Sequence, residues 1–292
     1  MPARARLALM TAVLLWAVSF VATKVALEVA PPLVVVTLRL LISALCFLPF
    51  VAFTGGLKGL GGFRGLGWLL VLSLFGTSLH YATQTVGLQF TTASNGSVYT
   101  TTGPVTILLL SALILGEKIT RRKALGVAIA LAGVLVVMGW DTLRSFELGN
   151  VKGDLLVLSS IVLWGMFTVF GKEVTDRLGA LRVTLWVTFL GAASMVPVGW
   201  LEARTAGFNL SDVTVDAWVA IVFLGVGCSF LATLLYFVAL GLSESQKVGV
   251  YLYTIPPLTA VVAALYLGER ITPNLVVGAA LVVAGVALTE RG

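Results

Sequence analysis

Leu115-Gly116-Glu117-Lys118-Ile119-Thr120 returns 152 positions later as Leu267-Gly268-Glu269-Arg270-Ile271-Thr272. The match continues on both sides. At the same offset, Val98-Tyr99 and Pro104 correspond to Val250-Tyr251 and Pro256, and Gly126 and Gly133 correspond to Gly278 and Gly285. A similarity that extends over half of a chain indicates that an ancestral unit was duplicated. We therefore expect two related halves, residues 1–145 and 149–292.

The composition of the chain is typical of a membrane protein. Of its 292 residues, 59% are hydrophobic and 11% charged, and the mean hydropathy is +1.04; soluble domains have about 25% charged residues. The charges lie in short breaks between apolar runs, each long enough to cross about 30 Å of hydrocarbon. We predict an all-α polytopic membrane protein with ten transmembrane helices, near residues 7–27, 33–53, 66–89, 94–115, 121–139, 153–174, 180–201, 215–242, 246–267 and 273–290.

The basic residues predict the orientation of these helices. With the N-terminus inside, most of the 19 lysines and arginines fall in the inner loops and ends, and Arg144, Lys152, Arg204 and Arg270 fall in the outer loops. Membrane proteins concentrate basic residues on the cytoplasmic side. We therefore expect both termini to be cytoplasmic. This bias also accounts for the net charge of +6, so no nucleic-acid partner is expected.

Five spans per half is an odd number, so the second half must be inverted relative to the first. The charges after the repeated motif agree with this expectation: Arg121-Arg122-Lys123 corresponds to Pro273-Asn274-Leu275. Basic residues follow one copy and are absent after the other, as expected when the two copies face opposite sides of a membrane. The early spans also match, because Trp16 and Lys24 correspond to Trp164 and Lys172 at an offset of 148.

Taken together, these motifs resemble the EamA-type drug/metabolite transporters. The resemblance rests on Trp16 and Lys24 in the first span, Arg39 and Ala44 in the second, and Leu-Gly-Glu-x-Ile-Thr with downstream Gly and Ala-Gly-Val in both halves. It implies a secondary transporter of small organic solutes, with a central cavity lined mainly by the first four helices of each half and with peripheral fifth and tenth helices. Within this group, the resemblance points first to exporters of aromatic and other neutral amino acids.

Polar side chains inside a membrane are costly and usually face a cavity or another helix. The only histidine, His80, lies in the third span with Thr77 and Gln84 on one helix face and Tyr81 beside it. We interpret this stripe as a substrate-contacting patch, with a hydrogen bond between helices as the alternative.

Aromatic residues add further candidates for the pathway. Trp16 and Trp164 are near mid-span, too deep for the interfacial aromatic belt. Repeat symmetry places Tyr99 and Tyr251 at opposite ends of one pathway, and Tyr253 adds a ring beside Tyr251. Packing between helices is the alternative for each ring.

Arg39 lies about two turns into the second span. It is a candidate for binding a substrate carboxylate. The alternatives are that its side chain extends to the outer interface or that it pairs with Glu28.

Pro104, Pro256 and Pro257 interrupt the fourth and ninth spans at related positions. A proline removes a backbone donor and can bend a helix. We predict hinges at these three residues.

The sequence predicts a transporter rather than an enzyme. It has no phosphate-binding loop, no cluster of metal ligands and no mid-span carboxylate, so we expect neither a cofactor nor a metal. Uncoupled or exchange transport is the first hypothesis. Proton-coupled export of drugs or amines through His80 is an alternative, and a polytopic membrane enzyme is the alternative from another class. The expected partners are a small solute and the lipid bilayer of a bacterial inner membrane. We expect a monomer, with a dimer as the alternative.

Overall fold

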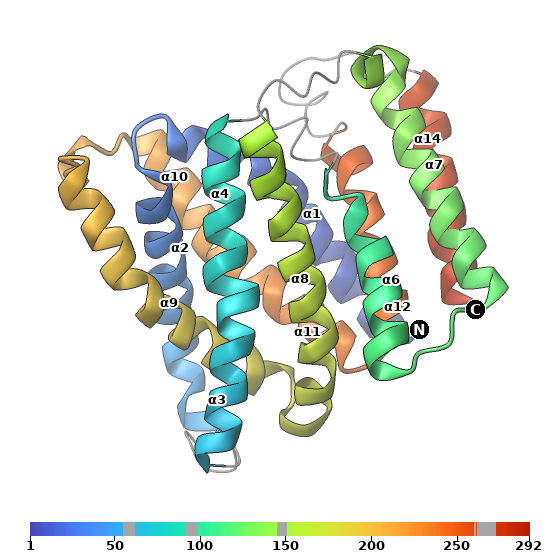
Figure 1. The fold of residues 1–292 in the computed structure, drawn as a ribbon, viewed down its shortest axis with the longest axis horizontal. Helices are drawn as coiled ribbons and strands as arrows, with labels where there is room; N and C mark the ends of the chain where they lie inside the picture. Colours follow the sequence, from blue (N-terminus) through green and yellow to red (C-terminus); the bar gives the residue numbers. More distant parts are fainter. Residues whose placement is uncertain (55–61, 91–98, 145–150, 260, 262–272) are drawn as a thin grey trace.

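The computed structural model describes residues 1–54, 62–90, 99–144, 151–259, 261 and 273–292. All of the regular structure in these ranges is helical, and the long helices lie side by side in a bundle with both termini at the same end (Figure 1). The second copy of the repeated motif, residues 267–272, and residues 146–148 between the two predicted halves lie outside the described residues.

The helices follow the predicted spans closely. The first half contains α1 (Ala3–Leu27), α2 (Pro32–Phe47), α3 (Gly62–Ser73), the π-helix η3 (Leu74–Leu79), α4 (His80–Phe90), α6 (Thr102–Leu115) and α7 (Arg121–Arg144). The second contains α8 (Val151–Leu178), α9 (Ala180–Thr205), α10 (Val215–Val222), the π-helix η5 (Phe223–Ala232), α11 (Thr233–Leu240), α12 (Ser245–Gly249), the 3₁₀-helix η6 (Val250–Thr254) and α14 (Pro273–Glu290). Short 3₁₀-helices are η1 (Leu48–Phe50), η2 (Ala52–Thr54) and η4 (Leu210–Asp212).

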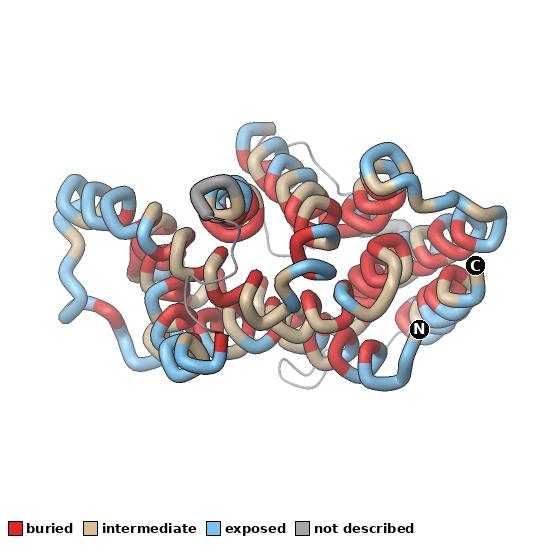
Figure 2. The backbone as a smooth tube through the Cα atoms, turned by 90° about the horizontal axis from the view of Figure 1, so that it is seen from below, coloured by how far each residue is buried: buried red, intermediate tan, exposed pale blue. Residues whose placement is uncertain are grey.

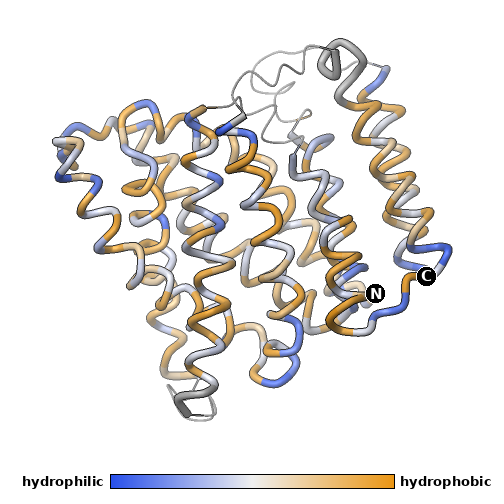
Figure 3. Tube along the Cα trace, viewed as in Figure 1, coloured by the Kyte–Doolittle hydropathy of each residue, from blue (hydrophilic) through white to orange (hydrophobic). Residues whose placement is uncertain are grey.

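The surface of the bundle is apolar along its length. Seven helical runs among the described residues are long and apolar enough to cross a membrane, and Thr102–Leu115 is apolar but shorter. Large hydrophobic side chains are exposed, among them Leu113 at 83% and Val215 at 78%. Buried residues face the interior of the bundle (Figure 2), and hydrophilic stretches gather mainly at the helix ends (Figure 3). Exposing this much apolar surface to water is unfavourable for a monomer. The chain is therefore an all-helical polytopic membrane protein.

Two spans contain a π-helical segment at corresponding positions. η3 interrupts the run from α3 to α4, and η5 interrupts the run from α10 to α11. A π-helix adds a residue to the turn and changes which side chains share a face, and such segments are frequent at functional sites. His80, the first residue of α4, comes directly after η3.

α7 and α14 pack against each other at one side of the bundle (Figure 1). A Cβ atom added to Gly126 would lie 2.6 Å from the carbonyl oxygen of Gly285, and one added to Gly133 would lie 2.7 Å from that of Gly278. Their backbones are therefore in direct contact, which requires glycine at these positions. In these contacts the residue numbers fall along α14 as they rise along α7, so the two helices run antiparallel.

α2 and α9 also pack antiparallel. The Thr37 hydroxyl donates to the carbonyl oxygen of Met195 at 3.0 Å, while the backbone N–H of Leu33 donates to the Glu202 carboxylate at 2.7 Å. The residue numbers fall along α9 as they rise along α2. Glu202 also accepts from the N–H of Val34, and so caps the start of α2, where backbone donors have no partner within the helix.

Candidate functional site

The central cavity lies among α1, α2, α4, α6, α8 and the segment that follows α12. Its volume is about 560 Å³ including its open mouth. The lining residues come from both halves: Trp16, Ser19, Phe20, Arg39, His80, Tyr81, Gln84, Thr100, Gly103, Ile161, Trp164, Leu252 and Ile255. Six of the predicted site residues are among them. Their predicted role in substrate binding stays a prediction.

Trp16 and Trp164 meet at the centre of this site. Their ring centroids are 5.1 Å apart with an interplanar angle of 85°, an edge-to-face contact, which is a favourable geometry for aromatic pairs. Tyr236 lies 5.3 Å from Trp16 and 5.4 Å from Trp164, and its hydroxyl is 3.1 Å from that of Thr168. Trp16 and Trp164 form an apolar wall of the cavity, and the fully buried Tyr236 packs against both rings.

His80 provides a polar group at the edge of this wall. Its ring centroid is 5.1 Å from that of Trp164 and 5.0 Å from that of Tyr81. Its Nδ1 lies 2.8 Å from the carbonyl oxygen of Ser160. A carbonyl oxygen can only accept, so Nδ1 carries the hydrogen; when the ring is neutral, Nε2 is an acceptor. The hydrogen bond to Ser160 thus joins α4 to α8, and the His80 ring also lines the cavity.

Arg39 is buried, with 3% of its surface exposed. Its Nε donates to the Ser229 hydroxyl at 2.9 Å, and its guanidinium lies 4.0 Å from the centroid of the Tyr81 ring. Glu28, the predicted alternative partner, is exposed, and within the described ranges no salt bridge involves Arg39. The guanidinium is therefore held in the interior instead of extending to the interface or pairing with Glu28.

The fourth and ninth spans are both broken beside the cavity. Thr100 and Gly103 line it from the first break, and Leu252 and Ile255, at an offset of 152, line it from the second. Pro104 lies in the first turn of α6, and Pro256 and Pro257 follow the 3₁₀-helix η6 in the same way. The prolines therefore stand in the first turn after each break, where a missing N–H costs little, and not within a continuous helix.

Three predicted site residues do not line this cavity. Tyr99 is buried beside the buried carboxylate of Asp154. The Tyr251 hydroxyl bonds to Glu290 of α14, which also pairs with Arg6. Tyr253 is fully buried. For these three rings too, the choice between a pathway and packing between helices stays a prediction.

The sequence analysis also missed residues that the structure places at the site. The apolar lining from Phe20, Ile161, Leu252 and Ile255 carries no signal distinct from an ordinary core. Thr77, expected on the same stripe as His80 and Gln84, donates to the carbonyl oxygens of Ser73 and Val187 instead. The offset of 152 would have linked Thr100 with Leu252 and Gly103 with Ile255.

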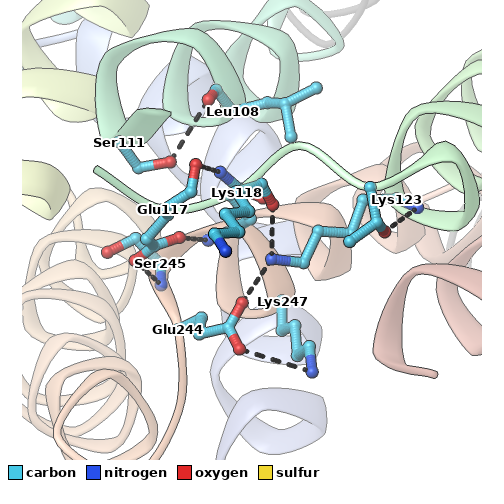
Figure 4. A network of polar contacts seen from close by, with 10 residues as sticks. Leu108, Ser111, Glu117, Lys118, Lys123, Glu244, Ser245 and Lys247 are labelled. Carbon is cyan, nitrogen blue, oxygen red and sulfur yellow. Dashed lines mark hydrogen bonds and ion pairs between the residues drawn. The ribbon is translucent and has the colours of Figure 1, made fainter. Parts of the chain in front are cut away.

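At the end of the bundle that carries the termini, the repeated motif connects the two halves (Figure 4). Gly116 ends α6 with a φ of 68°, a left-handed conformation that favours glycine. The next residue, Glu117, accepts hydrogen bonds from the backbone N–H groups of Ser245 (2.8 Å) and Gln246 (3.1 Å) at the start of α12. The Gln246 side chain donates back to the Glu117 carbonyl at 3.2 Å.

A second set of charges reinforces this junction. Lys123 of α7, with a side chain only 3% exposed, pairs with Glu244 and donates to the carbonyl oxygen of Lys118 at 3.0 Å. Lys247 lies 3.6 Å from the other oxygen of Glu244. Partial burial alone would raise the pKa of Glu244, but the hydrogen bond and charge of Lys123, together with Lys247, lower it below its ordinary value. Glu244 is thus held ionised between two lysines.

A second hollow lies at this end, lined among others by Glu117, Glu173, Glu244 and Lys247. The stretch from Glu244 to Ile255 contributes to both hollows, because Leu252 and Ile255 line the central cavity. It therefore borders both hollows, with Glu244 and Lys247 at the terminal one and Leu252 and Ile255 at the central cavity. In the described part of the chain, no group of three His, Cys, Asp or Glu residues could hold a metal ion.

Comparison with known proteins agrees with this architecture. The profile of the EamA-like transporter family matches the chain twice, over residues 4–139 and 151–291. An uncharacterized transporter of Archaeoglobus fulgidus is 31% identical over 99% of this chain and 98% of its own length. A probable amino-acid metabolite efflux pump of Salmonella typhimurium is 25% identical over 96% and 92%.

The fold is also that of a solved crystal structure, with a TM-score of 0.78 and 22% identity over 98% of this chain and 97% of the other. The family profile covers nearly the whole chain in two matches. The chain belongs to the EamA-like transporter family, and it is a membrane transporter rather than an enzyme.

Proposed function

We propose that this transporter exports small organic solutes, foremost aromatic or other neutral amino acids and related metabolites, across a bacterial inner membrane by alternating access. The observation that carries the proposal is the central cavity, at which equivalent breaks in the fourth and ninth spans meet the equivalent tryptophans Trp16 and Trp164. Broken helices at the junction of two repeats are where transporters bind their substrates. The similarity to a probable amino-acid metabolite efflux pump supports the substrate class.

The proposed halves, residues 1–145 and 149–292, are inverted repeats with both termini cytoplasmic. If a two-fold axis in the membrane plane relates them, equivalent helices that touch must run antiparallel. The pairs α7 with α14 and α2 with α9 do so. The fourth and ninth spans follow the same rule, since a Cβ on Gly249 would lie 3.0 Å from Ile107, while one on Gly103 would lie 3.6 Å from Leu252.

In this proposal, the segment from Glu244 to Ile255 is the inner barrier of the transport cycle. The Glu117 carboxylate and the Lys123–Glu244 ion pair hold its start against the connection between α6 and α7. Opening toward the cytoplasm requires these contacts to break, with Pro256 and Pro257 at the far end of the segment as hinges. Pro104 has the corresponding place in the outer barrier.

The proposed transport is uncoupled or by exchange. A proton- or sodium-coupled carrier commonly places a carboxylate at the substrate site, and the described lining of the cavity contains none. The test is counterflow of labelled aromatic and neutral amino acids into proteoliposomes, with and without a pH gradient. The proposal predicts flux without the gradient and no accumulation driven by it. Accumulation driven by the gradient and lost in His80→Gln would replace it with proton coupling through His80. Absence of flux for every amino acid would refute the substrate class.

A further inference from the structure

Arg39 is the only residue with a permanent charge in the described lining of the central cavity. It lies on α2, two turns from the helix start, and is 3% exposed. A buried guanidinium is costly unless hydrogen bonds and an opposite charge compensate for it. The described residues provide one hydrogen bond, from Nε to Ser229 at 2.9 Å, and one aromatic face, the ring of Tyr81 at 4.0 Å.

These two contacts orient the guanidinium and leave its outer edge without an acceptor. Ser229 occupies Nε, and Tyr81 covers one face of the planar group. Within the described ranges, the hydrogen bond from Nε is the one found for Arg39, and neither Nη group has a carboxylate partner. A planar guanidinium with two adjacent free N–H groups matches the geometry of a carboxylate, which it binds through two parallel hydrogen bonds.

No group of opposite charge is available for an ammonium ion. The described polar lining contains no carboxylate: apart from Arg39 it includes the imidazole of His80 and the side-chain amide of Gln84. Taking an ammonium ion out of water beside a guanidinium, with neutral acceptors alone, is unfavourable. The aromatic walls from Trp16, Trp164 and Phe20 suit the apolar part of a solute.

We propose that Arg39 makes the site selective for the carboxylate of its solute: the carboxylate is required, the α-amino group is dispensable, and the decarboxylated amine is rejected. The inference rests on the proposed function, and it extends the substrate class to aromatic monocarboxylates without an amino group. The carboxylate lies against the Nη groups of Arg39, and the ring lies among Trp16, Trp164 and Tyr81. An α-amino group donates to His80 Nε2.

Three ligands with one ring and different head groups test this inference. Phenylalanine, 3-phenylpropionate and phenethylamine compete at pH 7 with labelled phenylalanine for binding to the purified full chain. We expect 3-phenylpropionate to compete within about tenfold of phenylalanine. Phenethylamine, which loses the charge-assisted bonds to Arg39, should be weaker by about 10- to 100-fold. Equal competition by phenethylamine, or failure of 3-phenylpropionate, would overturn the inference and leave transport of amino acids standing.

Variants connect the selectivity to the guanidinium. Arg39→Gln should weaken both carboxylates by about 10- to 100-fold and reduce their advantage over phenethylamine, while Arg39→Lys retains part of it. Arg204→Gln is the matched control, because Arg204 also stacks on an aromatic ring, 4.5 Å from Trp200, but is exposed and away from the cavity. If Arg39→Gln does not fold, Arg39→Lys and the ligand series on the unaltered chain decide. If none of the three ligands binds, the proposed substrate class fails together with the inference.

Discussion

Replacing Glu117 with glutamine should open the inner barrier. The carboxylate accepts from two backbone N–H groups at the start of α12, those of Ser245 at 2.8 Å and Gln246 at 3.1 Å. A glutamine amide has a single oxygen, so in Glu117→Gln one of the two N–H groups faces an NH₂ group that is itself a donor. The other hydrogen bond loses its charge assistance. The barrier segment is then held mainly by the Lys123–Glu244 ion pair.

The size of the effect follows from these two bonds. A hydrogen bond to a charged group contributes about 1.5–3 kcal/mol. Losing one such bond therefore shifts the equilibrium between the closed and open inner barrier by about 10- to 150-fold, since 1.36 kcal/mol corresponds to a factor of ten. The Gln246 side chain still donates to the carbonyl of residue 117, so the connection is weakened and not abolished.

The assay measures access to the central cavity from the terminal side. Ser19→Cys places a thiol in the cavity lining, on a background in which Cys46→Ser and Cys228→Ala remove the native thiols. A membrane-impermeant maleimide is applied from the side that carries the termini. We expect labelling to be about tenfold faster or more in Glu117→Gln. Glu173→Gln is the control, because Glu173 is exposed in the same hollow and has no hydrogen bond or ion pair among the contacts found in the described residues.

Unchanged labelling in a correctly folded Glu117→Gln would refute the reasoning, because it would mean that the Glu117 cap does not hold the barrier closed. Equal acceleration in Glu173→Gln would refute it as well, since removal of any negative charge from the hollow would then be sufficient. Thermal unfolding of each purified variant establishes that it is folded.

Three further predictions concern packing, aromatic contacts and pH. Gly285→Leu would place a Cβ 2.5 Å from backbone atoms of α7, so its unfolding temperature in detergent should fall by several degrees or more, whereas Gly67→Ala, with nothing within 4 Å, should change it little. Trp164→Ala should raise the half-saturating concentration of aromatic solutes in counterflow by about tenfold, and Trp200→Ala, which alters an exposed ring, should leave it unchanged. The lowered pKa of Glu244 means that its ion pairs contribute fully above about pH 4.5 and are lost as pH falls through the lower folded-state value; labelling of Ser19→Cys, divided by that of a fully exposed cysteine at the same pH to correct for the thiolate fraction, should therefore be constant from pH 7 to 5 and rise only at lower pH.

The helices and much of the cavity could be predicted because the membrane limits the choices. Apolar runs long enough to cross the bilayer are helices, because apart from a closed β-barrel only a helix forms all of its backbone hydrogen bonds in lipid. Polar and titratable side chains are rare inside such helices, so the few present, His80, Gln84 and Arg39 among them, were recognisable from the sequence as candidates. All three line the cavity.

The face of a residue on an irregular helix could not be predicted. Tyr251 and Tyr253 were proposed for the pathway from the repeat, which pairs Tyr251 with Tyr99, and from the position of Tyr253 beside Tyr251. The ninth span begins as the five-residue α12 and continues as the 3₁₀-helix η6, which has 3.0 residues per turn instead of 3.6, so the faces of a regular helix do not apply. The Tyr251 hydroxyl bonds to Glu290. The apolar Leu252 and Ile255 face the cavity in their place.

Two corresponding contacts between the halves differ in their side chains, and this difference gives the cavity a single charged site. At one contact between the halves, the Thr77 hydroxyl donates to the backbone oxygen of Val187 at 3.3 Å. The equivalent residues are Ser229, at an offset of 152 from Thr77, and Arg39, at an offset of 148 from Val187. They are joined by the hydrogen bond from the Arg39 side chain to the Ser229 hydroxyl. At this position the second half has Val187, whose side chain is buried. The first half has Arg39, whose guanidinium is bound by Ser229 and lines the cavity. A symmetric pair of arginines would place two like charges in one small apolar space, at a high cost in free energy. Within the proposed pair of inverted repeats, a single arginine gives the cavity one charged end, so a solute with one carboxylate can bind in one orientation.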